Sequence, residues 1–283
     1  MNFRPGLYIV STPIGNLNDI TIRALETLKN SDIILCEDTR ISAKLLAKHN
    51  ITGSLSIYND QSDETTRKYI IKNIEAGKVV SLISDAGTPL ISDPGYKLVR
   101  EVKEKGYFID IAPGVSAPIA ALTLSGLPSD RFIFDGFLPK TDIGREKVFL
   151  EFAEVDATLI FFDRSTRIVD SLQAALKILG NREANVSREL TKLFQESRTS
   201  DIESLIKHYS QNLPKGEIVL LISGKKSLES SEEKLITEIK NLLILGTHTK
   251  DITQQLFQKY HKHYKKSKIY KICNSLKGTK HRI

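Results

Sequence analysis

The first candidate site is a loop rich in glycine, proline and aspartate that directly follows an apolar stretch. Residues 81–95 read SLISDAGTPLISDPG. Gly87 and Gly95 let the backbone approach a ligand closely, while Pro89 and Pro94 prevent a helix from starting at once. Such a loop leaves backbone N–H and C=O groups available to a flat, polar ligand. The alternative is an ordinary turn.

A second segment, residues 11–19, has the same character. It reads STPIGNLND and also follows an apolar stretch. Pro13 and Gly15 delay the start of a helix and leave the backbone accessible. This segment is therefore a second candidate for ligand contact, again with an ordinary turn as the alternative.

A third segment, CEDTR at residues 36–40, gathers two acids and one base within a single turn. Glu37 and Asp38 could accept or steer a proton, and Arg40 could hold a phosphate group. The alternative is a helix N-terminal turn in which the acids favour the helix dipole and Arg40 forms a local ion pair. The sequence leaves both interpretations open.

Several common nucleotide and metal motifs are absent from the sequence. No GxGxxG follows an expected strand, and SGKKS at residues 223–227 lacks the spacing of a P-loop. No GxSxG motif occurs. The six histidines do not pair with cysteines or carboxylates at metal-ligand spacing, so no metal site is expected.

The first half of the chain alternates between strand-like and helix-like segments. This pattern is typical of a mostly parallel sheet that is covered on both faces. Ligands bind such sheets at the carboxyl ends of the strands, and the three polar loops are expected at those ends. The expected strands are 6–12, 32–38, 53–59, 78–85 and 107–114, and the expected helices are 19–31, 40–50, 63–77 and 95–106.

Residues 112–126 interrupt this alternation and are expected to lead into a second domain. We expect two α/β domains and a small helical C-terminal region, with limits at 1–113, 114–226 and 227–283. The expected strands of the second domain are 131–139, 157–163, 185–190 and 216–223, with helices near 145–154, 166–179 and 201–209.

The composition is that of an ordinary globular protein. The chain has 283 residues, of which 40% are hydrophobic and 27% are charged. No apolar run approaches the roughly 18 residues that a membrane span requires, and no secretory leader is evident. Cys36 and Cys273 form no CxxC motif. We therefore expect a cytoplasmic protein without a membrane anchor.

Positive charge is concentrated at the C-terminus. The net charge of the chain is +7, yet residues 250–283 alone contain ten Lys or Arg and one acid. This region could bind a polyanion, with Lys265 and Lys266 among its contacts, or it could be a solvated basic face. Tyr260, Tyr264 and Tyr270 in the same region could pack or stack.

Five segments in order resemble the tetrapyrrole-methylase-type (class III) S-adenosylmethionine methyltransferases. The resemblance runs from about Gly6 to Ser223, and DAGTP followed by DPG is its specific part. Within the superfamily, these motifs are most similar to the members that methylate small-subunit ribosomal RNA. The five segments are LYIVSTPIGNLNDIT, EDTR, SLISDAGTPLISDPGYKLV, PGVSA and SRELTKLFQE.

This resemblance implies a fold and a reaction. The fold would have two α/β domains with the cofactor, S-adenosylmethionine, in the cleft between them, and the chain would form a homodimer. The reaction would be methyl transfer to the ribose 2′-hydroxyl of a cytidine in the decoding region of 16S ribosomal RNA, on the small ribosomal subunit. Two alternatives stay open: a tetrapyrrole methylase, and a non-catalytic RNA-binding assembly factor.

Site residues follow from the chemistry of these loops and, for the cofactor, from the resemblance. Glu37, Asp38 and Arg40 are the catalytic candidates, and Asp85 is expected to serve the loop or the cofactor's amine and hydroxyls. The cofactor would contact Pro13, Gly15, Asp85, Ala86, Gly87, Thr88, Leu90, Ile91, Ser116, Ala117, Phe162 and Leu190.

Substrate contacts are expected from a different set of residues. Asn59 and Asp60 could contact ribose or base, and Arg167, Lys265 and Lys266 could contact RNA. Many members of the family carry a Glu-Ser-Pro-His-Arg-like run where this chain has DRSTR at 163–167. Because Thr166 stands in the His position, no catalytic His is expected there.

Overall fold

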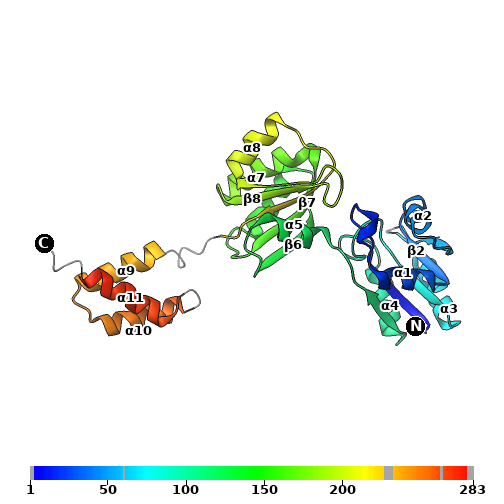
Figure 1. Cartoon of the computed structure of the whole chain (residues 1–283), viewed down its shortest axis with the longest axis horizontal. Helices are drawn as coiled ribbons and strands as arrows, with labels where there is room; N and C mark the ends of the chain where they lie inside the picture. The colour runs from blue at the N-terminus through cyan, green and yellow to red at the C-terminus, as the bar shows by residue number, and fades with distance from the viewer. Residues whose placement is uncertain (1–2, 60, 226–231, 262–263, 279–283) are drawn as a thin grey trace. The chain divides into compact units, whose positions relative to one another are not determined.

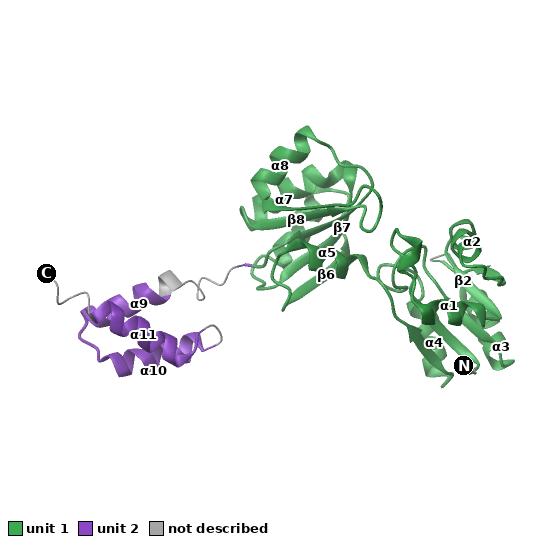
Figure 2. Cartoon of the chain, viewed as in Figure 1, with its two compact units in different colours: residues 1–224 green, residues 225–283 purple. Residues whose placement is uncertain are grey.

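The computed structural model describes residues 3–59, 61–225, 232–261 and 264–278. The chain forms two compact units, residues 1–224 and residues 225–283 (Figure 2). Unit 1 contains two five-stranded sheets, and unit 2 contains helices (Figure 1). The fold class predicted from the sequence, two α/β sheets followed by C-terminal helices, is confirmed.

The first sheet has the strand order β3-β2-β4-β1-β5, and all of its pairs are parallel. Strands and helices alternate along the chain as the sequence predicts. The elements are β1 (Gly6–Val10), η1 (Leu17–Asp19), α1 (Ile22–Lys29), β2 (Ile33–Cys36), α2 (Thr39–Lys48), β3 (Leu55–Ile57), α3 (Glu64–Glu75), β4 (Val79–Leu82), α4 (Tyr96–Glu104) and β5 (Ile109–Ala112).

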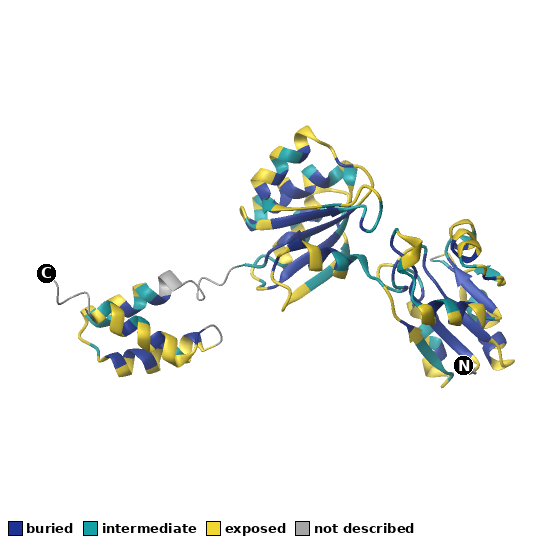
Figure 3. Ribbon diagram, in the orientation of Figure 1, coloured by how far each residue is buried: buried dark blue, intermediate teal, exposed yellow. Residues whose placement is uncertain are grey.

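The strand β1 shows why this sheet must be covered on both faces. All five of its residues are buried, and successive side chains point to opposite faces. Leu7 and Ile9 belong to one hydrophobic cluster, whereas Tyr8 and Val10 belong to another. The central strands are therefore buried throughout (Figure 3).

The second sheet has the order β6-β7-β10-β8-β9. The pair β6–β7 is parallel, and the other three pairs are antiparallel. The elements of this part are α5 (Ala117–Ser125), β6 (Phe132–Phe137), α6 (Asp142–Glu151), β7 (Thr158–Arg164), η2 (Ser165–Arg167), α7 (Ile168–Leu179), β8 (Glu183–Arg188), β9 (Glu196–Asp201), α8 (Ile202–Gln211) and β10 (Glu217–Ile222).

The sequence does not predict the edge strand β9, which reads ESRTSD. Its alternate residues are polar, so it lacks the apolar period of a half-buried strand. Instead it pairs with β8 through a polar ladder: the amide of Asn185 donates to Ser197 and Thr199 at 2.9 and 2.8 Å, and the Ser187 hydroxyl donates to Ser197 at 3.0 Å. Hydroxyl and amide side chains thus replace apolar cross-strand contacts here.

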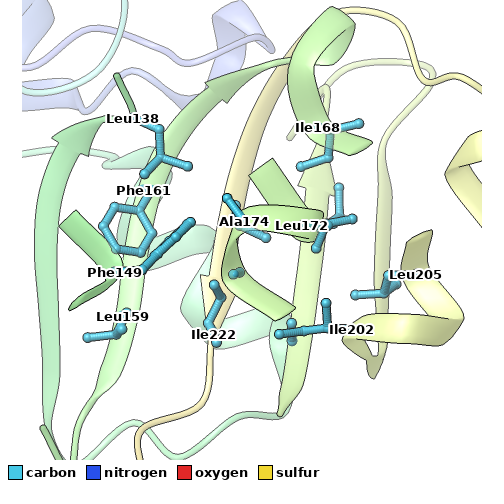
Figure 4. Close-up of a cluster of buried hydrophobic side chains, with 14 of the residues drawn as sticks. Leu138, Phe149, Leu159, Phe161, Ile168, Leu172, Ala174, Ile202, Leu205 and Ile222 are labelled. Carbon is cyan, nitrogen blue, oxygen red and sulfur yellow. The ribbon is translucent and has the colours of Figure 1, made fainter. Parts of the chain in front are cut away.

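Hydrophobic clusters cover both faces of the second sheet. On one face, residues of β7 and β10 pack with residues of α6, α7 and α8; Figure 4 shows Phe149, Phe161 and Leu172 in this cluster. On the other face, Ala121 and Leu122 of α5 pack against the sheet. Ile14, from the loop after β1, belongs to the same cluster as Ala121 and Leu122, so this loop contacts the second sheet.

Unit 2 contains α9 (Glu232–Ile244), α10 (Thr249–Tyr260) and α11 (Lys266–Gly278). Its own hydrophobic core includes Leu235, Ile252 and Cys273. Tyr260 and Tyr264 pack in this core, whereas Tyr270 is 42% exposed. Across the described residues of the whole chain, every helix is too short or too polar to span a bilayer.

Candidate functional site

A cavity of about 400 Å³ lies in unit 1, and residues of both sheets line it. This volume is within the range of about 300–1,000 Å³ that small-molecule sites occupy. The loops after β1, β2 and β4 all contribute, through Ile14, Glu37 and the segment from Asp85 to Asp93. The sequence placed candidate sites in these three loops, and the parallel sheet brings them together at one edge.

Backbone hydrogen bonds hold the loop after β4 against the loop after β1. Thr12 N donates to Gly87 O at 2.8 Å, and Gly87 N donates to Thr12 O at 3.1 Å. The Thr12 hydroxyl also donates to Ser84 O at 3.0 Å. Gly87 has a φ of +83°, a left-handed conformation in which side chains are disfavoured. The two backbone hydrogen bonds between Thr12 and Gly87 therefore fix a backbone turn on the wall of the cavity.

Thr88 connects this loop to the segment that precedes α5. Its hydroxyl donates to Val115 O at 3.2 Å and lies 3.2 Å from the Ser11 hydroxyl. The next residues, Ser116 and Ala117, line the cavity. A small hydroxyl side chain thus aligns two backbone segments without filling the space between them.

The CEDTR turn forms a helix cap. Asp38 is the N-cap of α2, and its Oδ1 accepts hydrogen bonds from Arg40 N at 2.8 Å and Arg40 Nε at 3.0 Å. Its Oδ2 accepts from Arg40 Nη2 at 2.6 Å. These bonds lower the pKa of Asp38 to about 2, so it is a weak base. Of the three catalytic candidates, Glu37 lines the cavity.

Asp85 is a half-buried carboxylate on the cavity wall. Its Oδ1 accepts a hydrogen bond from Asp38 N at 3.2 Å, which links the loop after β4 to the helix cap. Burial raises the pKa of Asp85 above its ordinary value, although the bond from Asp38 N opposes this effect. Asp38 and Asp85 are adjacent carboxyls whose environments move their pKa values in opposite directions.

Acidic residues dominate the charge of the cavity. Five acids and one base line it, so the lining favours a ligand with positive charge. The acids are Glu37, Asp85, Asp93, Asp163 and Glu217, and the base is Arg164.

The second sheet supplies an apolar wall. Phe162, Leu190 and Val219 line the cavity, and the Phe162 ring lies 5.0 Å from the ring of Phe134 and 5.1 Å from that of Phe137. Such a surface suits the faces of a flat ring. Asp163, the next residue of β7, also lines the cavity, but its side chain is fully buried.

Most of the residues expected to bind cofactor lie together at this cavity. These are Asp85, Ala86, Gly87, Thr88, Ile91, Ser116, Ala117, Phe162 and Leu190. Pro13, Gly15 and Leu90 do not line it: Pro13 is buried next to Ile14, Gly15 approaches Leu190 O and Thr191, and Leu90 packs against the core of the first sheet.

The expected substrate residues are dispersed. Asn59 forms a turn in which its Oδ1 accepts from Gln61 N at 3.0 Å, and Asp60 lies outside the described residues. Arg167 donates to Asp163 at 3.0 Å. Lys265 and Lys266 are exposed in unit 2.

Sequence reasoning missed several lining residues from the second sheet, including Asp163, Ser187 and Glu217. They lie within or next to strands, where an alternating pattern suggests packing rather than ligand contact. Asp163 is the penultimate residue of β7, and its carboxylate accepts from Arg167 of η2 at 3.0 Å.

Comparison with known proteins identifies a family and a set of relatives. The family model described as Tetrapyrrole (Corrin/Porphyrin) Methylases matches residues 6–206. A Rickettsia prowazekii (strain Madrid E) protein named ribosomal RNA small subunit methyltransferase I is 56% identical over 279 residues, which cover 99% of this chain and 100% of that protein. A Thermotoga maritima protein of the same name is 43% identical over 220 residues, covering 78% of this chain and 99% of that protein.

Solved structures show the same fold at low sequence identity. Diphthine synthase aligns with a TM-score of 0.61 and 16% identity, covering 77% of this chain and 89% of that one. The cobalamin biosynthetic enzyme cobalt precorrin-4 methyltransferase aligns with a TM-score of 0.58 and 19% identity, covering 77% and 94%. At these identities the similarity concerns the fold alone.

Proposed function

This chain belongs to the tetrapyrrole methylases and, within them, to the ribosomal RNA small subunit methyltransferase I family, and from that premise we propose its reaction. It transfers a methyl group from S-adenosylmethionine to the ribose 2′-hydroxyl of a cytidine in the decoding region of 16S ribosomal RNA. The observation that supports this substrate class is the 56% identity with the Rickettsia relative over nearly the whole of both chains.

The cavity suits S-adenosylmethionine. When bound, this cofactor supplies an electrophilic methyl group on a positively charged sulfonium. The acid-rich lining favours its positive charge, and the apolar wall around Phe162 favours its adenine ring. Gly87 leaves one wall without a side chain, and its φ of +83° disfavours any other residue there.

The carboxylates of the first sheet have separate roles in this proposal. An acid in contact with the sulfonium would stabilise the ground state more than the transition state, in which the charge is dispersed. Asp85 is therefore assigned to an amine or hydroxyl of the cofactor. Glu37, the cavity residue of the CEDTR turn, is assigned to the proton of the attacking hydroxyl. Asp38 and Arg40 position this turn.

Unit 2 is assigned to substrate capture. Residues 225–283 contain fourteen Lys or Arg and five Asp or Glu, whereas residues 1–224 carry a net charge of −2. Basic residues gain affinity for RNA by displacing counterions from phosphates. We place the enzyme in the cytoplasm, where small subunits are found, and we propose that it acts as a homodimer.

Mapping of ribose methylation tests this proposal. Small subunits from a strain that lacks the gene are incubated with the purified protein and labelled S-adenosylmethionine, and 16S RNA fragments are analysed by mass spectrometry. The expected product is one 2′-O-methylcytidine in the decoding region. Label on a base, or label on a uroporphyrinogen-type substrate but not on the subunit, would contradict it.

A further inference from the structure

Two apolar side chains on the wall of the cavity are exposed. Phe137, the last residue of β6, is 61% exposed, and Ile91, in the loop after β4, is 44% exposed. By contrast, Phe162, whose ring lies 5.1 Å from that of Phe137, is half-buried. Small-molecule sites are lined by apolar and aromatic side chains that the ligand covers. The exposed ring of Phe137, which the sequence did not single out, is therefore a surface that an occupant of the cavity can cover.

A β-bulge turns Phe137 toward this cavity. Between Phe134 and Phe137, β6 has one residue more than the facing part of β7. Successive strand residues point to opposite faces, so the extra residue brings Phe137 to the face that carries Phe134 and Phe162. The bulge includes Gly136, whose φ of +73° suits glycine. Beyond it, Leu138 N donates to Phe162 O at 3.0 Å, so the backbone on both sides of Phe137 is fixed.

The loop after β4 presents Ile91 through a second irregular backbone. Its neighbours Leu90 and Ser92 have φ values of +73° and +65°, a left-handed conformation that residues other than glycine rarely adopt. Such strain is concentrated at active sites and ligand sites. A Cβ at Gly136 would lie 3.1 Å from Ser92 Oγ, so this loop approaches the bulge closely. Irregular segments from both sheets thus present Ile91 and Phe137 on one part of the cavity wall.

We propose that Phe137 and Ile91 form the subsite for the base of the target nucleotide, with the base stacked on the Phe137 ring. This inference rests on the function proposed above. The acid-rich lining disfavours phosphate, so the part of an RNA strand that enters the cavity is the uncharged base with its ribose. The nucleotide leaves the RNA stack to do so, as in enzymes that extrude a base into a pocket.

Exposure distinguishes this base from the purine ring of the methyl donor. Leu190 and Val219 are buried and Phe162 is half-buried, so they form the inner part of the apolar wall, which is assigned to the donor. Phe137 is open to a second ligand that arrives from solvent. Stacking on an aromatic ring tolerates every base, so Phe137 contributes affinity for the nucleotide rather than the choice of cytidine.

Paired measurements on Phe137→Ala test the subsite. The affinity for S-adenosylmethionine, measured by calorimetry, should stay within twofold of the wild type. The kcat/KM for methylation of small subunits should fall by about 5- to 150-fold, the range expected for the loss of one stacked base. Phe137→Tyr keeps the ring and should retain most of the activity, and Ile91→Ala should show the same pattern with a smaller loss. Phe132→Ala, on the same strand and 43% exposed but outside the cavity lining, is the control.

Two outcomes of these measurements would overturn the inference. One is an unchanged kcat/KM in a folded Phe137→Ala enzyme. The other is a loss of S-adenosylmethionine affinity as large as the loss of kcat/KM, because Phe137 would then hold the donor. A wild-type protein that binds S-adenosylmethionine but methylates no small subunit would instead overturn the proposed function.

A crosslinking experiment needs only the wild-type protein. Small subunits are reconstituted with 5-iodocytidine at the nucleotide that the enzyme methylates, and they are irradiated together with the protein and S-adenosylhomocysteine. The crosslinked peptide should contain Phe137 or Ile91. A crosslink confined to another segment, or no crosslink from a subunit that is still a substrate, would overturn the inference even where the variants do not fold.

Discussion

In the CEDTR turn, one acid caps a helix and the other lines the cavity, a distinction that the sequence alone could not make. Asp38 caps α2 and binds Arg40 through both of its oxygens, whereas its neighbour Glu37 lines the cavity. A carboxylate with a pKa of about 2 holds a proton weakly at neutral pH. The structure therefore favours the helix-cap interpretation for Asp38 and Arg40, and it makes Glu37 the better candidate for chemistry.

Matched amide substitutions in this turn separate the two tasks. Glu37→Gln should lower kcat by about 100-fold or more, because a positioned acid–base group typically contributes 10²–10⁴. Its affinity for S-adenosylmethionine should change only a few-fold. Asp38→Asn should stay active, because asparagine caps helices about as well as aspartate. Single-turnover methylation and calorimetry measure both quantities. An Asp38→Asn enzyme that folds normally but is inactive would show that Asp38 takes part in catalysis.

Asp85 should give a stability difference that depends on pH. Because the pKa of Asp85 is raised in the native protein, its ionised form lowers the stability of the folded state. This destabilisation is present at neutral pH and is absent once the carboxyl is protonated. Asp85→Asn should therefore raise the melting temperature at pH 7 by a few degrees at most, and this gain should disappear as the pH falls below the ordinary range of aspartate. A gain that grows in acid would contradict this assignment.

Among the elements, the loop after β4 is the part of the site that sequence predicts best. Glycine and proline within residues 81–95 already indicate a rigid loop at the carboxyl end of a strand, and the parallel order of β1, β2 and β4 places it beside the other two loops. The wall formed by β7 and β10 was less predictable. Its residues occupy ordinary strand positions, so their ligand contacts depend on how the second sheet packs.

Two glycines in loops that flank β4 allow a controlled test of the loop after that strand. Gly87 and Gly77 have φ values of +83° and +85°, so alanine is strained by a similar amount, about 1–2 kcal/mol, at both. Gly87 lines the cavity, whereas a Cβ at Gly77 would meet no atom within 4 Å. Both alanine variants should have a lower melting temperature than the wild type, and only Gly87→Ala should bind S-adenosylmethionine more weakly. Equal affinity in both would show that the loop after β4 does not contact the cofactor.

At the scale of the whole molecule, unit 1 is proposed to carry out methyl transfer and unit 2 to bind the RNA substrate. The Thermotoga relative aligns over 220 residues that make up 99% of its length, close to the 224 residues of unit 1. Unit 2 has its own core, and a truncation before Lys250 would cut between α9 and the rest of that core. Changes of surface charge are therefore a cleaner test of capture than a deletion.

The double variant Lys265→Gln, Lys266→Gln tests capture. Both lysines are exposed at the start of α11, so their loss should leave folding unchanged. If each contacts a phosphate, the slope of log affinity for small subunits against log salt concentration should fall by about 0.7–0.9 for each lysine. Lys97→Gln, on the exposed face of α4, is the control. An unchanged slope would show that these lysines form only a solvated surface.

The cavity shared by the two sheets of unit 1 is proposed to hold the methyl donor. A crystal structure of the full chain with S-adenosylmethionine tests it most directly. The donor is expected in this cavity, in contact with Gly87 and Ser116. A donor bound at any other place on the chain, with the cavity left to solvent, would contradict this assignment of the cofactor site.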